Sequence, residues 1–482
     1  MAVAGPGAQD GDKVTAEETT PTPTPTPTPI PTPTPIPTPI PPATVRNRLR
    51  GRLGRLSGHP DFMRMWAGET ISMFGSQVTY IAIPLTAALV LHAEPGEMGV
   101  LHAAGFAPFL LLTLFAGVWV DRKRRRPILI VTNAGRAVLL AFIPLSALFG
   151  WLSMPQLYVI SLLVGSLNVF FELAYQSYLP TLVSKDDLVE GNSKLQMSAS
   201  MSSIGGPGIA GLLLEVLSAP FALLADAVSF LVSAVMMMCI RTPELEPQRL
   251  HAKGSFRREI GEGIAIVFKN AYLRVFALEA ASYNFFWNLI EAVYILYAVR
   301  ELGASPLVIG LVFSLGSLGS LLGALVAARW ADRFGLGRAI TIAMAISCVS
   351  TLLIPLAGDG VLGPWLVGAA FFVGGLGVTA SVVHVVSLRQ TVTPGHLLGR
   401  MNGSYRFITW GVIPLGALLG GFLGEVISLR AALVVGAVGM SLAWLWVLFS
   451  PVPRLRKLSD LEPPTGEPRR HEEDSRPVDL AA

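Results

Sequence analysis

The segment Gly117-Val-Trp-Val-Asp121-Arg-Lys-Arg-Arg-Arg126 separates two long apolar stretches and decides the fold, because the sequence contains it twice. The second copy, Ala328-Arg-Trp-Ala-Asp332-Arg-Phe-Gly-Leu-Gly-Arg338, lies about 211 positions later. Further matches occur at nearly the same spacing: Phe62-Met-Arg64 with Tyr272-Leu-Arg274, Glu69 with Glu279, Asn192 with Asn402, and residues 211–218 with 421–428. A repeat of this length indicates that the chain is a duplication of one structural unit.

The composition predicts a membrane protein. Hydrophobic residues make up 52% of the 482 residues and charged residues only 14%, whereas soluble domains have about a quarter charged residues. We expect an all-α integral membrane fold of twelve transmembrane helices in two six-helix parallel repeats, because each apolar stretch can cross a hydrocarbon core of about 30 Å. The stretches lie near 66–91, 97–120, 127–149, 155–180, 192–216, 220–240, 272–299, 305–330, 339–357, 362–388, 402–426 and 429–450.

Cationic residues fall almost entirely on one side of the predicted membrane. The basic run before Trp66, the Asp121 loop, the segment 241–274 and the loops near Lys185, Arg333 and Arg400 share that side, and the opposite loops contain only Arg300 and Arg430. Short basic loops stay cytoplasmic, so we expect both termini in the cytoplasm. Topology then accounts for the net charge of +4, and no nucleic-acid partner is needed.

The chain divides into five parts by composition. We predict a disordered Pro/Thr-rich and basic tail over 1–59, six-helix bundles over 60–240 and 271–450, a cytoplasmic linker over 241–270, and a disordered tail over 451–482. The Pro-Thr repeat at 21–42 is typical of an extended spacer, with a proline-recognising partner as the alternative. Within the linker, one apolar helix face suits a position on the inner membrane surface; it contains Phe256, Ile260, Ile264, Val267 and Phe268.

The sequence gives little support for metal or enzymatic chemistry. Cys239 and Cys348 have no motif spacing, so we expect no disulfide, metal or cofactor. No His-Glu-x-x-His helix, nucleophile elbow or phosphate-binding loop is present, which argues against an enzyme.

With these motifs in view, the chain resembles the major facilitator superfamily over nearly all of residues 60–450. Gly117-x-x-x-Asp121-Arg122-x-x-Arg125-Arg126 is similar to the signature between that superfamily's second and third helices, with Arg124 where most branches have Gly. Asn133-x-x-Arg136, Gln176-x-x-Leu-Pro180 and Asp226-Ala-x-Ser-Phe230 resemble the macrolide-efflux and enterobactin-exporter branch. The resemblance implies drug–proton antiport, with a substrate site between two rocking halves.

The Asp121 loop is a candidate gate. Asp121 can accept hydrogen bonds from the start of a neighbouring helix, while Arg122 and Arg125 pair with carboxylates across the bundle. The resemblance implies that this neighbour is the helix near Asn402. Asp332 and Arg333 form a weaker copy. A purely topological role explains the basic residues but not Asp121.

Helix 5 contains Gly206, Pro207 and Gly211, which resemble the Gly-Pro signature of proton-coupled exporters. We expect Pro207 and its neighbouring glycines to break helix 5, and Pro414 to break helix 11 in the same way. Close packing of small residues is the alternative.

Charged residues inside apolar spans are candidate proton-coupling groups. Arg136 and Glu172 lie at similar depth and can pair, as a structural salt bridge or as a titrating site. We expect Asp226, near the outer end of helix 6, to be satisfied and partly solvated. The resemblance places Glu69 and Glu279 against the central cavity, with Glu291 higher in helix 7; a wetted wall without a coupling role is the alternative.

Aromatic residues crowd helix 7, and those that face inward would form an apolar cavity suited to a bulky amphipathic compound. The candidates are Tyr283, Phe286, Trp287 and Tyr294. We therefore predict a monomeric exporter in a bacterial inner membrane, whose partners are a small-molecule substrate, protons and the lipid bilayer. An importer on the same fold and a non-transporting receptor or scaffold are the alternatives.

Overall fold

The computed structural model describes residues 55–244 and 256–460, apart from the side chains of residues 55, 114, 118, 121, 185, 256–260 and 396. All regular elements in these ranges are helical, as predicted. The N-terminal half contains α2 (Pro60–Leu85), α3 (Pro95–Asp121), α4 (Arg125–Leu148), α5 (Met154–Leu182), α6 (Leu188–Val216) and α7 (Ala219–Met238). The C-terminal half contains α9 (Ala271–Arg300), α10 (Pro306–Phe334), α11 (Leu336–Ser350), α12 (Leu362–Thr391), α13 (Leu398–Gly411), α14 (Ile413–Val426), α15 (Leu429–Ala443) and α16 (Leu445–Leu448).

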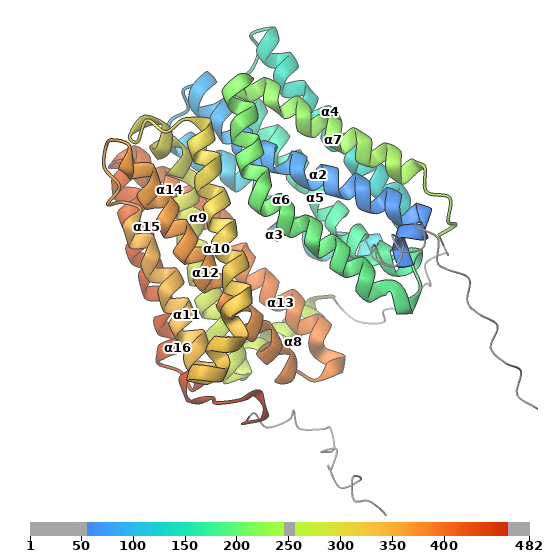
Figure 1. Cartoon of the computed structure of the whole chain (residues 1–482), viewed down its shortest axis with the longest axis vertical. Coiled ribbons are helices and arrows are strands. Elements are labelled where there is room, and N and C mark those ends of the chain that lie inside the picture. The colour runs from blue at the N-terminus through green and yellow to red at the C-terminus, as the bar shows by residue number, and fades with distance from the viewer. Residues whose placement is uncertain (1–54, 245–255, 461–482) are drawn as a thin grey trace, which may run out of the picture. The chain divides into compact units, whose positions relative to one another are not determined.

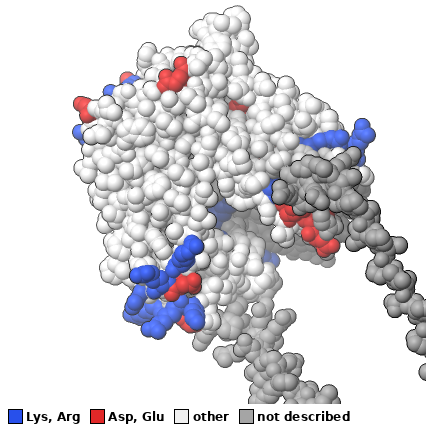
Figure 2. Space-filling model, viewed as in Figure 1, with Lys and Arg blue, Asp and Glu red and all other residues white. Residues whose placement is uncertain are grey.

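Ten helical segments of the described residues are long and apolar enough to cross a membrane, so this is a multi-pass membrane protein. The α6 and α9 helices are 29 and 30 residues long but are not among the ten. Polar side chains inside them, such as Glu279 and Glu291 in α9, lower their hydropathy. The total of twelve spans therefore remains a prediction. Figure 2 shows charged side chains near the ends of the helices and an uncharged flank between them.

Each half is a helical bundle, and helix pairs that correspond under the sequence repeat pack in the same way in both halves (Figure 1). In the N-terminal half α7 packs against α2 and α4, and α5 packs against α3 and α4. In the C-terminal half α12 packs against α10 and α11, and α9 packs against α14 and α15.

The two halves meet most extensively through two helix pairs, α3 with α14 and α6 with α10, and also where α3 contacts α9 and α13. A Cβ atom on Gly211 would lie 2.7 Å from the carbonyl oxygen of Pro306, and one on Gly421 would lie 2.8 Å from that of Pro95. These four residues are equivalent under the sequence repeat, so one close contact is made twice. We call the end of the bundle that contains them the closed end; the predicted orientation places it outside the cell.

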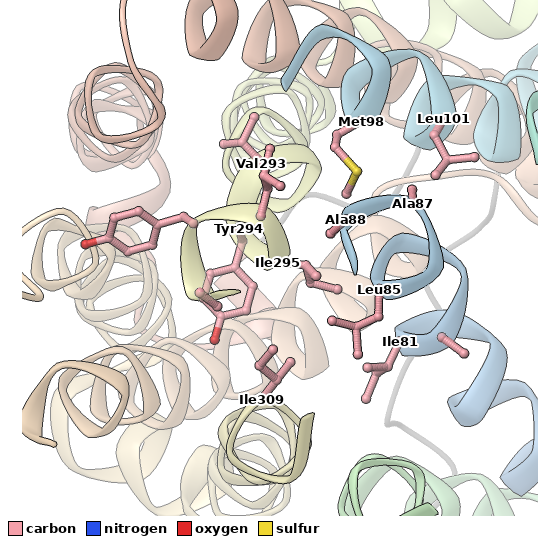
Figure 3. Close-up of a cluster of buried hydrophobic side chains, with 14 of the residues drawn as sticks. Ile81, Leu85, Ala87, Ala88, Met98, Leu101, Val293, Tyr294, Ile295 and Ile309 are labelled. Atoms are coloured by element: carbon pink, nitrogen blue, oxygen red, sulfur yellow. The ribbon is translucent and has the colours of Figure 1, made fainter. Parts of the chain in front are cut away.

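Apolar side chains from both halves fill the space beside the closed end (Figure 3). Leu85 and Met98 of the N-terminal half lie in one buried cluster with Ile295 and Ile309 of the C-terminal half. In lipid the hydrophobic effect contributes little to helix association, so shape-matched packing of such side chains holds the halves together.

Two predictions about helix breaks have different outcomes. Helix 11 is broken, because α13 ends at Gly411 and α14 begins at Ile413, next to Pro414. Helix 5 is not broken: α6 runs without interruption through Pro207. A proline within a membrane helix is tolerated where neighbouring groups satisfy the freed carbonyl.

The boundaries of the predicted tails are corrected by the packing of two apolar residues. Leu56, which lies in the short helix η1 (Arg55–Gly58), is 1% exposed. At the other end Val452 is buried, and the backbone N–H of Leu336 donates to the carbonyl of Arg456 at 3.0 Å. Order therefore extends as far as Asp460. The Pro-Thr repeat and the last residues of the chain lie outside the described ranges.

The linker forms the helix α8 (Phe256–Lys269), which packs against α13 and α9. Gly263 and Val267 are buried, and Arg400 of α13 donates to Glu262 at 2.7 Å. The side chains of Phe256 and Ile260, two residues of the predicted apolar face, lie outside the description. The position of α8 at a membrane surface remains a prediction.

Candidate functional site

A cavity of about 340 Å³ lies between the two halves. Helices α2, α3 and α5 supply one wall, and α9 and α10 supply the other. Because both halves line it, any change in their relative tilt changes access to it. Its polar and aromatic lining includes Thr79, Tyr80, His102, Phe106, Phe109, Asn168, Glu291 and Phe313.

A second cavity of about 210 Å³ lies in the C-terminal half, and Tyr80 and Phe313 line both spaces. Of the aromatic candidates from the sequence, Tyr283 and Trp287 line this second cavity. The other two candidates, Phe286 and Tyr294, line neither cavity.

Tyr294, which is labelled in Figure 3, is only 2% exposed. Its ring centroid lies 5.6 Å from that of the cavity-lining residue Phe313. Phe286 points instead towards α15, where it lies against Gly439. Sequence reasoning missed Tyr80, Phe313 and Phe371, because aromatic residues scattered over three helices give no local pattern.

Glu291 joins the two halves across the cavity. The hydroxyl of Tyr80, in α2, donates to its Oε1. A second link between the halves is formed by His102 of α3, whose Nε2 lies 2.9 Å from Oδ1 of Asn288 in α9. The amide nitrogen of Asn288 in turn donates to the carbonyl of Asn284 at 2.8 Å. Nothing in the sequence singled out this polar chain, since each member is an ordinary helix residue in isolation.

Asp226 is more deeply buried than predicted. Its side chain is 0% exposed, and its carboxylate accepts hydrogen bonds from the hydroxyls of Thr79 and Ser229. The expectation of a satisfied carboxylate is met, but the expectation of partial solvation is wrong, because α2 packs directly against the face of α7 that contains Asp226.

Arg136 and Glu172 do not pair with each other. Arg136 donates to Asn168 at 2.8 Å and to Asn133, and its guanidinium lies 4.2 and 4.1 Å from the ring centroids of Phe171 and Phe230. Similar depth in adjacent helices was not enough, because the two side chains point to different neighbours.

Glu172 instead accepts from Arg406 of α13 at 2.7 Å. This ion pair joins the two halves, and the Arg406 guanidinium also lies 4.1 Å from the ring centroid of Trp410. The sequence analysis did not identify Arg406, because it lies close to the predicted end of helix 11, where a basic residue is explained by topology.

Glu69 and Glu279 occupy equivalent places, and each is 6% exposed. Neither is among the residues that line the two cavities. The Oε2 atom of Glu69 has no hydrogen-bond partner in the described part of the chain. These carboxylates are therefore buried away from the linings of these two cavities, and their place against a central cavity remains a prediction.

The candidate gate residues make contacts within their own halves. The backbone N–H of Arg125 donates to Glu244 at 2.7 Å, and its guanidinium lies 3.7 Å from the same carboxylate. Asn402 accepts from Arg389 at 2.9 Å. Arg122, Asp332 and Arg333 are exposed.

Asp121 is the last residue of α3, and its side chain lies outside the description. The contact expected between Asp121 and the start of helix 11 therefore remains a prediction. The cross-bundle pairing expected of Arg125 is replaced by its pair with Glu244, which follows α7 in the same half.

The Gly-Pro segment of α6 lies at two helix contacts. A Cβ on Gly206 would meet the side chain of Gln77 in α2. Gly211 and the carbonyl of Pro207 lie against α10, as described for the closed end. At the same end the carboxylate of Glu215 accepts from the backbone N–H of Leu307 at 3.1 Å, which caps α10 from across the halves.

Comparison with known proteins supports this description. A family model described as transmembrane secretion effector (MFS_3) matches residues 57–473. The chain is 27% identical over 400 residues to the multidrug efflux pump Tap of Mycolicibacterium fortuitum, covering 80% of this chain and 93% of that protein. It is 26% identical over 380 residues to macrolide efflux protein A of Streptococcus pyogenes, covering 77% and 90%.

Two further comparisons extend this result. The enterobactin exporter EntS of Citrobacter koseri is 24% identical over 424 residues, covering 86% of this chain and 98% of that protein. A crystal structure of the nucleoside transporter NupG has a TM-score of 0.63 at 11% identity, covering 81% of this chain and 99% of that one. The NupG comparison shows the shared fold alone.

Proposed function

Because the chain belongs to the transmembrane secretion effector family of major facilitator transporters, we propose that it exports a hydrophobic or amphipathic small molecule in exchange for protons. Membership makes it a transporter of a small molecule and not an enzyme. Export is the proposal favoured by the relatives, three of which are named as efflux or export proteins.

The cavity between the halves carries the proposal. It is lined by α2, α3 and α5 from one half and by α9 and α10 from the other. The two glycine contacts between the halves, Gly211 with Pro306 and Gly421 with Pro95, lie at the closed end. Rocking of the halves about this cavity would open the closed end and deliver the substrate to the other side.

Contacts across the closed end would act as a latch that holds the two halves together there. The Arg300 guanidinium donates to the carbonyls of His92 and Ala93 at 3.2 and 2.9 Å and lies 3.7 Å from the carboxylate of Glu94. With the Glu215 cap on α10, these contacts join the halves and must break in each cycle. Asp121 and its copy Asp332 are proposed to form the opposing latch on the cytoplasmic side.

Proton exchange is assigned to the buried carboxylates Glu69 and Glu279. A carboxylate withdrawn from water binds a proton more readily than one in solvent. Their equivalent positions give each half one such group. We further propose that the protein is a monomer in a bacterial inner membrane with both termini in the cytoplasm, as the basic loops indicate.

Everted membrane vesicles test direction and coupling together. Vesicles from cells that make the protein are acidified inside by ATP hydrolysis and offered a panel of fluorescent amphipathic compounds. An exporter accumulates at least one compound, and nigericin, which collapses the pH gradient, abolishes the accumulation. Loss of a preloaded compound under the same gradient would indicate an importer instead.

Matched variants sharpen this test. The double variant Glu69→Gln with Glu279→Gln is expected to lose accumulation. Asp359→Asn changes an exposed carboxylate in the loop before α12 and should retain it. If no compound responds to the gradient in any preparation, the proposal fails.

A further inference from the structure

The wall between the two cavities is built from aromatic rings of both halves. The Phe313 ring lies 5.4 Å from that of Tyr80 and 5.6 Å from that of Phe371. The Trp287 ring lies 5.3 Å from that of Phe371. Edge-to-face contacts of this kind hold the rings in fixed orientations, so the wall is a rigid surface with π-electron density available to a ligand.

One carboxylate lies at the junction of this wall. Glu291 lines the larger cavity and accepts from Tyr80, which lines both. Within the described part of the chain no lysine or arginine pairs with Glu291, and none lines either cavity. His102 is the one basic side chain on the walls, and its ring nitrogen is held by Asn288.

From this arrangement we propose that the transported molecule is an organic cation. Its cationic centre binds between Glu291 and the ring of Tyr80, and its apolar body lies along Phe313 and Trp287. This inference rests on the proposed function, because it specifies the substrate class of the same cavity.

The physical basis is the shortage of positive charge around Glu291. An ionised carboxylate in a low-dielectric site is costly unless a cation or several hydrogen bonds compensate it. Tyr80 supplies one hydrogen bond. A bound cation would supply the missing charge, and aromatic faces add cation–π attraction. An anionic ligand would meet the carboxylate without any compensating base.

The smaller cavity suits one substituent of such a cation. Its volume is about 210 Å³, and beside its rings it offers the hydroxyls of Ser317, Ser320 and Ser347. Hydroxyl oxygens can accept hydrogen bonds and can turn towards a cation. The larger cavity would hold the rest of the ligand.

Binding of a matched probe pair to the purified full-length protein tests the proposal. The probes are methyltriphenylphosphonium, which carries a permanent charge, and triphenylphosphine oxide, which is neutral and has an oxygen in place of the methyl group. We expect the cation to bind at least tenfold more tightly in equilibrium dialysis. Glu291→Gln should weaken cation binding at least tenfold and change binding of the neutral probe less than twofold. Equal affinities, or an unchanged cation affinity in Glu291→Gln, would overturn the proposal.

Three further variants protect the test. Tyr80→Phe keeps the ring and releases the carboxylate, so the preference for the cation should persist. Tyr80→Leu removes the ring placed against the cationic centre and should reduce cation affinity more than neutral affinity, which provides a test even when Glu291→Gln does not fold. Asp359→Asn, outside both cavities, should leave both affinities unchanged.

Failure of this inference is distinguishable from failure of the proposed function. If vesicles accumulate neutral compounds under a pH gradient while the protein shows no cation preference, the exporter stands and the substrate class is wrong. If a Glu291-dependent cation preference occurs without gradient-driven transport, the cation site stands and the exporter proposal fails.

Discussion

Replacing Gly211 by alanine should destabilise the contact between the two halves at the closed end. It should therefore increase the population of the conformation in which the halves are separated there. A Cβ on Gly211 would lie 2.7 Å from the carbonyl oxygen of Pro306 and 2.9 Å from Cα of Leu307. Both are backbone atoms and cannot rotate away. Ordinary contact at a Cβ begins near 3.4 Å, so α6 and α10 must separate by about 0.7 Å at this point to relieve the overlap.

The size of the effect follows from the cost of overpacking. Forcing an extra methyl group into a packed contact costs about 1–3 kcal/mol. The gain in helix propensity from Gly to Ala applies in both states and cancels from their ratio. Each 1.4 kcal/mol changes a ratio tenfold, so the population ratio should move by about 5- to 150-fold.

The repeat provides a second variant and a control. Gly421→Ala makes the equivalent overlap with Pro95 and Gly99 and should shift the ratio in the same direction by a similar factor. Gly399→Ala is the control, because a Cβ there would have nothing within 4 Å.

Electron–electron double resonance measures the shift directly. Spin labels at Leu217→Cys and Val361→Cys, both exposed near the closed end, report the separation of the halves in a background with Cys239→Ser and Cys348→Ala. Gly211→Ala should add a population at longer distance that Gly399→Ala lacks. Identical distance distributions in these two variants would refute the packing argument.

Three further predictions concern single side chains. Asp226→Ala removes the acceptor of the Thr79 hydroxyl in a buried site, while the Ser229 hydroxyl keeps its bond to the carbonyl of residue 226 at 2.8 Å, and it should destabilise the protein by about 1–3 kcal/mol. An unchanged melting temperature in detergent would contradict this. Arg406→Gln breaks the ion pair with Glu172. Because both side chains are about one-third exposed, the loss of stability should be only about 0.2–1 kcal/mol, less than the effect of Gly211→Ala. A larger shift in the distance assay for Arg406→Gln than for Gly211→Ala would contradict this. Asp121→Asn should bind substrate normally and transport it slowly, as binding and counterflow assays can separate; wild-type counterflow would remove Asp121 from the gate.

The sequence predicted the architecture because the relevant signals are local or periodic. Apolar stretches of membrane length identify helices one at a time, and the recurrence of Asp121 as Asp332 reveals the duplication. The duplication then extends to contacts: Gly211 and Gly421 make the same approach to Pro306 and Pro95.

Pairing between helices was predicted less well. Arg136 and Glu172 lie at similar depth, yet they bind Asn168 and Arg406. Depth along a helix can be counted from the sequence, whereas the direction in which a side chain points depends on how each helix is rotated against its neighbours. The same limit explains why Tyr80 was missed at the centre of the site.

The central claim is that substrate and protons exchange across this cavity. Proteoliposomes that contain the purified protein, a transported compound and a trapped pH-sensitive dye are diluted into compound-free buffer of the same pH. Exchange predicts that the lumen becomes more acidic as the compound leaves, and that the Glu69→Gln and Glu279→Gln double variant abolishes this acidification. Departure of the compound with no change in lumenal pH would contradict the claim.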